Sequence, residues 1–333
     1  MSDRIRMRRS AAALLVAAVT TGSTLLLTAC DPEGGSGGSA ASTAAAPRTP
    51  AASEPAGTAS SGAPAKGGTL NKTAGTKLTV STNSATVLMD GKSVDFGTVV
   101  RDLAWSPDGK HAAFIDGDGN LQTSDPDGSH KTLVAKAPSG TTWSHPTWQV
   151  YGPNEPHGAG TFLLFTADDK KNLRLMSTEA KAGSKPDLLH VGDSEGVTEI
   201  PETGNLWPNS AGQYGWTVYA NKGDGQVYFH DVVSRTNGGV IGKGSQPATD
   251  EAGDVVFVRS VDGHSHIFTE ARGEQGKERD LTPGAALDYT EPVITRDGKT
   301  VAFRGPDGIY TVPTKGGKPD KVTDTVGLPA YRG

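Results

Sequence analysis

One short block of sequence occurs twice in altered form, and a recurring unit decides the architecture of a chain before any single residue is considered. The first copy spans residues 102–114 (DLAWSPDGKHAAF) and the second spans residues 291–303 (EPVITRDGKTVAF). Each copy predicts a short buried strand, an Asp-Gly turn and a second apolar strand. The repeat therefore predicts a β-sheet unit that recurs along the chain.

Further copies follow from alignment on the first one. From residue 76 onward, short β-rich runs alternate with turns of Gly, Asp, Asn and Pro, and no stretch shows sustained helical periodicity. The alignment predicts six inner-strand positions at Trp105, Trp148, Trp207, Thr249, Ile294 and Tyr331. Most of these positions lie about 40 residues apart, the length of a four-stranded propeller blade. The longer interval from Trp148 to Trp207 predicts insertions at 151–160 and 181–204, which as protruding loops are a second place for recognition.

The two ends of this region complement each other. Residues 328–331 match the first strand of a blade, whereas residues 77–81, 85–90 and 92–96 match strands two to four of a blade without its first strand. Pairing them closes a ring and removes two open sheet edges. We therefore expect an all-β domain at 73–333, a six-bladed β-propeller of four-stranded blades in which the C-terminal strand pairs with the N-terminal strands.

Residues 105–110 (WSPDGK), followed by a hydrophobic second strand, resemble the WD40-like (PD40) repeat of TolB-type β-propellers, which have six blades. The resemblance covers about residues 101–326 and is strongest in the first and fifth repeats. The N-terminal α/β domain, through which TolB engages its translocation partners, has no counterpart in this sequence. The resemblance therefore implies the fold and not the translocation role.

The first 29 residues have the pattern of a signal peptide, with a basic start and a short apolar stretch. Residues 27–30 (LTAC) resemble a bacterial lipobox, in which the cysteine is lipidated and cleavage occurs just before it. Cys30 is the single cysteine of the chain, so no other thiol is left for a disulfide, a metal or catalysis. We expect Cys30 to anchor the protein, by lipid such as palmitate, to the outer face of the cytoplasmic membrane. An ordinary secretory signal with an incidental cysteine is the alternative.

Residues 30–72 are almost entirely Gly, Ser, Ala, Pro and Thr. Such a segment buries too little apolar surface to offset its ordering entropy, so we expect a disordered tether. The net charge of −5 argues against a nucleic-acid partner. Any attraction to a membrane is therefore expected to come from the lipid.

Several motif matches fail on their structural context. Residues 192–196 (GDSEG) fit the G-x-S-x-G pattern of serine hydrolases, but an extended, proline-ended segment follows Ser194 where that motif needs a helix. Residues 116–120 (DGDGN) resemble the start of a calcium loop but lack its later Gly and Glu, and they predict a tight turn. His264 and His266 face one side of a strand, yet two histidines make a poor zinc site.

Two further patterns recur with the blades. The turns between second and third strands are repeatedly acidic, and in a propeller they emerge on one face, so we expect solvated turns, with a cation or a basic partner as the alternative. The acidic residues are Asp116, Asp118, Asp168, Asp169, Asp224, Asp262 and Asp307. Trp105, Trp148 and Trp207 stand at positions aligned as equivalent, which predicts packing between blades.

Binding residues are best predicted from the geometry of a propeller. The links between blades run toward the central axis, where all blades converge, so we expect a binding surface at the tunnel mouth. The candidate residues there are Arg101, Asp102, Trp143, His145, Glu202, Asn205, Gln246, Tyr289 and Glu291.

We therefore expect a monomeric, lipid-anchored, extracytoplasmic propeller without a cofactor that binds a protein or a cell-envelope component and is not an enzyme. The alternative is a metal-dependent propeller enzyme, lactonase- or lyase-like, with its site at the tunnel mouth. A third function class is sugar or peptidoglycan binding through exposed aromatic side chains.

Overall fold

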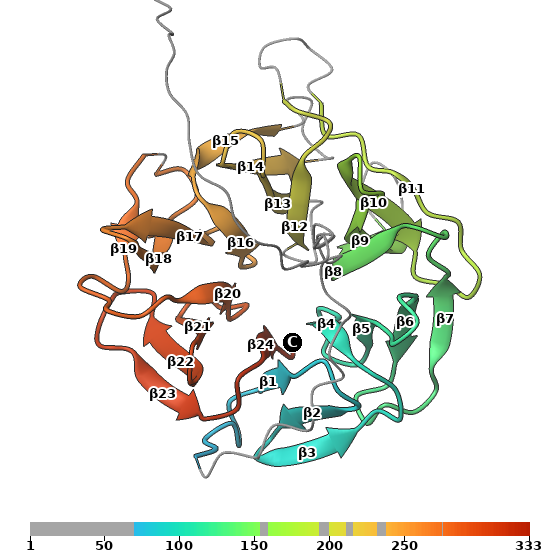
Figure 1. Cartoon of the computed structure of the whole chain (residues 1–333), viewed down its shortest axis with the longest axis horizontal. Coiled ribbons are helices and arrows are strands. Elements are labelled where there is room, and N and C mark those ends of the chain that lie inside the picture. Colours follow the sequence, from blue (N-terminus) through green and yellow to red (C-terminus); the bar gives the residue numbers. More distant parts are fainter. Residues whose placement is uncertain (1–69, 154–158, 193–199, 211–215, 232–237, 275) are drawn as a thin grey trace, which may run out of the picture. The chain divides into compact units, whose positions relative to one another are not determined.

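The computed structural model describes residues 70–153, 159–192, 200–210, 216–231, 238–274 and 276–333. In these residues the chain forms six four-stranded antiparallel sheets around a central axis, and it forms no helix (Figure 1). Accordingly, the described part of the chain has no helix of the length and apolarity that crossing a bilayer demands. The predicted six-bladed β-propeller is confirmed. Cys30, the signal peptide and the tether as far as residue 69 lie outside the described residues.

The first three blades follow one another around the axis, and the strands of each are named from the axis outward. Blade 1 consists of β24 (Leu328–Tyr331), β1 (Leu78–Ser81), β2 (Thr86–Met89) and β3 (Lys92–Asp95). Blade 2 consists of β4 (Arg101–Trp105), β5 (Ala112–Ile115), β6 (Leu121–Ser124) and β7 (Thr132–Ala135). Blade 3 consists of β8 (Thr142–Tyr151), β9 (Gly160–Asp168), β10 (Leu173–Glu179) and β11 (Asp187–Leu188).

The second half of the ring continues the same pattern. Blade 4 consists of β12 (Asn205–Ser210), β13 (Trp216–Asn221), β14 (Gln226–Asp231) and β15 (Gly238–Lys243). Blade 5 consists of β16 (Ser245–Thr249), β17 (Val255–Val261), β18 (His264–Glu270) and β19 (Arg279–Asp280). Blade 6 consists of β20 (Thr290–Ile294), β21 (Thr300–Gly305), β22 (Gly308–Pro313) and β23 (Asp320–Thr323). The segment 181–204, predicted as a protruding loop, contains β11 and thus part of a blade.

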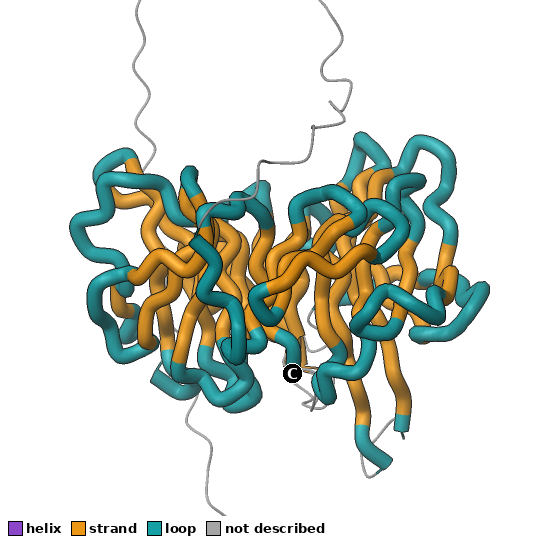
Figure 2. The backbone as a smooth tube through the Cα atoms, turned by 90° about the horizontal axis from the view of Figure 1, so that it is seen from below, coloured by secondary structure: helices purple, strands orange, loops and turns teal. Residues whose placement is uncertain are grey.

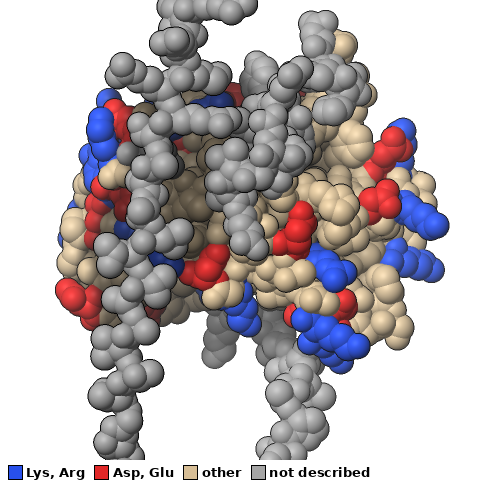
Figure 3. All heavy atoms as spheres, turned by 90° about the horizontal axis from the view of Figure 1, so that it is seen from above, with Lys and Arg blue, Asp and Glu red and all other residues tan. Residues whose placement is uncertain are grey.

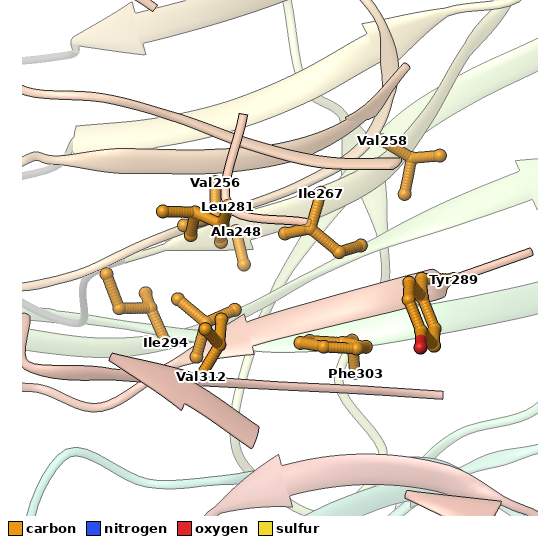
Figure 4. Packing of buried hydrophobic residues seen from close by; sticks show 10 residues of the cluster. Ala248, Val256, Val258, Ile267, Leu281, Tyr289, Ile294, Phe303 and Val312 are labelled. Atoms are coloured by element: carbon orange, nitrogen blue, oxygen red, sulfur yellow. The ribbon is translucent and has the colours of Figure 1, made fainter. Parts of the chain in front are cut away.

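The core lies between the blades. The second strands read as continuous apolar runs, such as AAFI in β5, because each is covered on both faces by a neighbouring blade. One interblade cluster joins Ala248 and Ile267 of blade 5 to Ile294 and Phe303 of blade 6 (Figure 4). The strands cross the thickness of the ring and the loops gather at its two faces (Figure 2).

Closure of the ring occurs in blade 1, as the sequence predicts. β24 pairs with β1 in the register Leu78↔Tyr331 to Ser81↔Leu328. The buried hydroxyl of Thr79 donates to the carbonyl of Ala330 at 2.9 Å and accepts from Nε1 of Trp105 at 2.9 Å. This hydroxyl therefore connects the closing sheet to blade 2.

The inner strands carry a recurring irregularity. In β4, β8, β12, β16 and β20 the pairing with the next strand slips by one residue, which is a β-bulge. The bulge residue has a left-handed φ between 50° and 55° in all five strands. These residues are Asp102, His145, Trp207, Gln246 and Glu291. A non-glycine residue in this conformation costs on the order of 1–3 kcal/mol, and such strain clusters at functional sites.

The bulges correct the predicted alignment of the third repeat. Trp207 is equivalent to Asp102 and His145, and it is not equivalent to Trp105 and Trp148 as predicted. Trp105 and Trp148 are buried and stand three residues after their bulge residues, the position that Ser210 holds in blade 4. The alignment was wrong because it matched residue type; the bulge residue followed by proline, as in His145-Pro and Glu291-Pro, marks the true register.

Candidate functional site

The six inner strands surround a central cavity of about 170 Å³. Each strand contributes a run of lining residues that begins, in five of the six, at its bulge residue. We call the ring of these five residues the axial mouth. It consists of Asp102, His145, Trp207, Gln246 and Glu291.

Two side chains of the axial mouth accept hydrogen bonds from the backbone of the next blade around the axis. Oδ2 of Asp102 accepts the backbone N–H of His145 at 3.1 Å, and Oε1 of Gln246 accepts the backbone N–H of Glu291 at 2.9 Å. A bulge removes a backbone N–H from the regular ladder, and a buried N–H needs a partner. The side chains of Asp102 and Gln246 supply that partner and fix the position of the next bulge.

A contact also crosses the axis. Nε2 of His145 lies 3.9 Å from Oε2 of Glu291, and these residues stand on blades 3 and 6, which are opposite in the ring. The imidazole of His145 also meets the indole of Trp207 edge-on, with 6.2 Å between ring centroids. Three blades therefore present side chains to one small volume.

The electrostatics of the axial mouth are dominated by its two carboxylates. Burial raises the pKa of Glu291, and the charge of Asp102 raises it further, whereas His145 and Arg304 oppose the shift. Within the described lining of the cavity, Arg296 is the single Lys or Arg, and it forms an ion pair with Glu251 beyond the far ends of the inner strands. On the side of the ring visible in Figure 3, by contrast, acidic and basic side chains are interspersed.

Of the nine predicted residues, four line the cavity: Asp102, His145, Gln246 and Glu291. Arg101 does not. Its Nη2 donates to the carbonyl of Asp116 at 2.6 Å, so the guanidinium braces a turn.

Trp143 and Tyr289 also lie outside the cavity lining, although each stands two residues before a bulge residue. Trp143 packs on Phe165 and Tyr289 packs on Phe303, with 4.8 Å between ring centroids in both pairs. Residues two apart share a face of a regular strand, but the bulge breaks that period.

Glu202 and Asn205 serve a turn. Oε1 of Glu202 accepts the backbone N–H of Gly192 at 2.8 Å, and the amide of Asn205 accepts from Asn221 at 2.7 Å. At the axial mouth, blade 4 contributes Trp207, which the sequence alignment placed between blades. Its Trp-Pro dipeptide is the signal that points to the axis.

In the other candidate sites, the polar side chains have partners within the protein. His266 Nδ1 lies 2.7 Å from Oδ2 of Asp280, while His264 faces Asp288, so the two histidines have separate partners. No group of three or more His, Cys, Asp or Glu side chains in the described residues is arranged to hold a metal ion. In the acidic turn, Oδ1 of Asp116 accepts two N–H groups of its own loop at 2.9 Å. Ser194 lies outside the described residues.

Comparison with known proteins places the fold. No protein family model matches the chain. Coronin-7 of Bos taurus is 29% identical over 135 residues, which are 39% of this chain and 13% of coronin-7. The chain therefore corresponds to a small part of that protein's length.

Solved structures match over most of the chain. TolB from Acinetobacter baumannii has a TM-score of 0.55 and 15% identity over 77% of this chain, but only 65% of that protein is covered. The putative TolB from Agrobacterium tumefaciens has a TM-score of 0.54 and 16% identity, with coverage of 75% and 89%. A chain of a nidogen/laminin complex has a TM-score of 0.54 and 11% identity, with coverage of 76% and 96%. At these identities the likeness concerns the fold, and it agrees with the TolB-type propeller expected from the repeat.

Proposed function

We propose that this chain is a binding module of the bacterial cell envelope that receives a protein partner at the axial mouth. One observation carries the proposal: five inner strands leave regular pairing at the same point, and each places a different side chain at one end of one cavity. Five residues in a strained backbone conformation, with side chains of varied chemistry directed to one cavity, are the pattern of a recognition surface.

Binding fits these residues better than catalysis does. Asp102 and Gln246 use their oxygen atoms to accept backbone N–H groups of the next blade. Their first task is therefore to hold the ring in place. The carboxylate of Glu291 and the imidazole of His145 face each other across the axis without a nucleophile between them in the described residues. Together they form a rigid, polar rim.

The proposed location is the outer face of the cytoplasmic membrane, with the lipid on Cys30. The first described residues, 70–72, pair with outer strand β23 through a bridge between Asn71 and Thr323 and a hydrogen bond from Lys72 N to Val322 O at 2.9 Å. A tether that arrives there joins the ring at its outer edge, away from the axis.

Photo-crosslinking in the native envelope tests this function. A photoreactive phenylalanine analogue replaces Trp207 in one strain and Leu133, which is exposed on outer strand β7, in a matched control strain. We expect a discrete crosslinked protein from position 207 and none from position 133. Identical products from both positions, or none from position 207, would overturn the proposal.

A further inference from the structure

We propose that the axial mouth binds a cationic group, the ammonium or guanidinium tip of a Lys or Arg side chain on the partner, which takes the place of His145 beside Glu291. This inference rests on the proposed function and specifies its ligand chemistry. It is carried by three features of the mouth: a carboxylate without a hydrogen-bond donor, an aromatic neighbour and a level of proline rings directly below the mouth.

The carboxylate of Glu291 lacks close donors. Its side chain is 20% exposed, and the nearest basic side chain is that of His145 at 3.9 Å, beyond hydrogen-bond distance. In the described part of the chain, no protein donor forms a hydrogen bond with either of its oxygens, and the backbone N–H of Glu291 donates to Oε1 of Gln246. A largely buried carboxylate without donors is costly, and a charge-assisted hydrogen bond to an ammonium or guanidinium would stabilise it.

The side chain of His145 is only loosely held beside Glu291. Its backbone is fixed by Asp102, but its Nδ1 is buried without a hydrogen-bond partner among the described residues, and its Nε2 is 3.9 Å from Glu291. A side chain with so few hydrogen bonds changes its rotamer at a small cost in free energy. An incoming cation can therefore replace it beside Glu291 without breaking a strong interaction.

The surroundings favour a cation over a neutral group. Asp102 adds a second carboxylate to the ring, and no Lys or Arg of the described lining stands at this end of the cavity. Trp207 supplies an indole, the aromatic ring to which cations bind best. Two carboxylates and an indole around one volume are suited to an ammonium or guanidinium.

The walls below the ring limit how far the cation enters. Each bulge residue except Asp102 is followed by a proline that lines the cavity: Pro146, Pro208, Pro247 and Pro292. Proline offers no backbone N–H and an apolar ring, so the level directly below the ring gives a charged group little to bind, and the next carboxylates of the lining, Asp250 and Glu251, lie at the far end of the inner strands. The cavity of about 170 Å³ has room for one side-chain tip with a few water molecules and not for a folded loop.

Titration of the full-length chain with small probes tests the inference. The probes are N-acetyl-lysine methylamide, its uncharged counterpart N-acetyl-norleucine methylamide, and spermidine, with binding followed by calorimetry. We expect a millimolar dissociation constant for the lysine probe and none measurable for the norleucine probe. Glu291→Gln and Asp102→Asn should each weaken the lysine probe about tenfold, which corresponds to about 1.4 kcal/mol. Glu251→Gln, at the far end of the inner strands, is the matched control and should leave binding unchanged.

The outcomes separate this inference from the proposed function. Equal affinity for the lysine and norleucine probes, or no effect of Glu291→Gln, would overturn the cationic ligand. If the crosslink from position 207 still forms in that case, the binding function stands and only the ligand chemistry is wrong. If the lysine probe binds and suppresses the crosslink from position 207, the cationic ligand and the binding function are both supported. Tight binding of spermidine that leaves the crosslink intact would assign the mouth to a small polyamine and overturn the side-chain ligand.

Discussion

Nε2 of His145 lies 3.9 Å from Oε2 of Glu291, although β8 and β20 belong to opposite blades of the ring. The bulges bring them together, because each turns a side chain toward the axis at the same level. The axial mouth is therefore narrow enough for residues three blades apart to interact. A ligand seated there touches several blades at once.

Replacing Glu291 with Gln should stabilise the protein at pH 7. Burial raises the pKa of Glu291 in the folded state, so between its ordinary pKa and the raised value the folded protein binds more protons than the unfolded one. The stability of the wild type therefore falls as pH rises through this interval. Thermal unfolding at several pH values should show the advantage of Glu291→Gln growing with pH and then levelling off.

Asp297, in the same blade, provides a control of opposite sign. Hydrogen bonds from Lys299 and Thr295 lower its pKa to about 2. Its contribution is present above the ordinary pKa and is lost as pH falls toward 2, so Asp297→Asn should destabilise the protein at pH 7 and cease to do so in acid. If the two variants follow the same pH trend, the environment described for Glu291 is wrong.

Two tryptophans should respond differently to alanine substitution. Trp105 is 8% exposed and its Nε1 donates to Thr79, so Trp105→Ala should reduce the free energy of unfolding by about 3–5 kcal/mol. Trp207 is only half-buried at the axial mouth, so Trp207→Ala should cost on the order of 1 kcal/mol and abolish partner crosslinking from a neighbouring position, Gln246. Urea unfolding measures both losses, and equal losses would contradict the different roles given to the two residues.

The hydroxyl of Thr79 should contribute more to the free energy of unfolding than its methyl group does. Thr79→Val leaves Nε1 of Trp105 without its acceptor and removes the side-chain donor to the carbonyl of Ala330, and we expect a loss of about 1–3 kcal/mol. Thr79→Ser keeps both hydrogen bonds and should lose about 0.8 kcal/mol for the missing methyl group. Chemical denaturation compares the pair, and a serine variant less stable than the valine variant would show that the hydroxyl does not connect the closing sheet to blade 2.

A lysine should not replace Arg259 in blade 5. The guanidinium donates to both carboxylate oxygens of Glu278 at 2.6 Å and lies 4.8 Å above the ring of Phe268. An ammonium cannot reproduce this fork, so Arg259→Lys should lose on the order of 1–3 kcal/mol in thermal or urea unfolding. A variant as stable as the wild type would mean that the paired contacts contribute nothing measurable.

The sequence predicts the ring well because spacing and turn residues carry that information. The repeat at 102–114 gives the blade length, and the unpaired strands at the two ends of the repeat region predict closure in one sheet, as β1 and β24 show. Side-chain direction at the axis is harder to predict, because a bulge breaks the two-residue period on which such predictions rest.

The bulge accounts for the predicted site residues Trp143 and Tyr289, and a residue-type match accounts for Trp207. The course of the links between blades predicts Trp143 and Tyr289 at the mouth, but the bulge residue after each points to the axis while the aromatic ring packs in the core. Residue type alone predicts Trp207 in the core, although the proline after it matches His145-Pro and Glu291-Pro. Alignment on the X-Pro step gives the correct register.

Closure in blade 1 also has a consequence for how the protein is made. During synthesis β1, β2 and β3 emerge first, but the strand that completes their sheet is β24, whose partner positions are about 250 residues later in the chain. Joining segments so distant in sequence is entropically expensive and slow. The growing chain therefore has no finished ring until residues 328–331 are available, and until then the inner edge of β1 is open to pairing with strands of other chains.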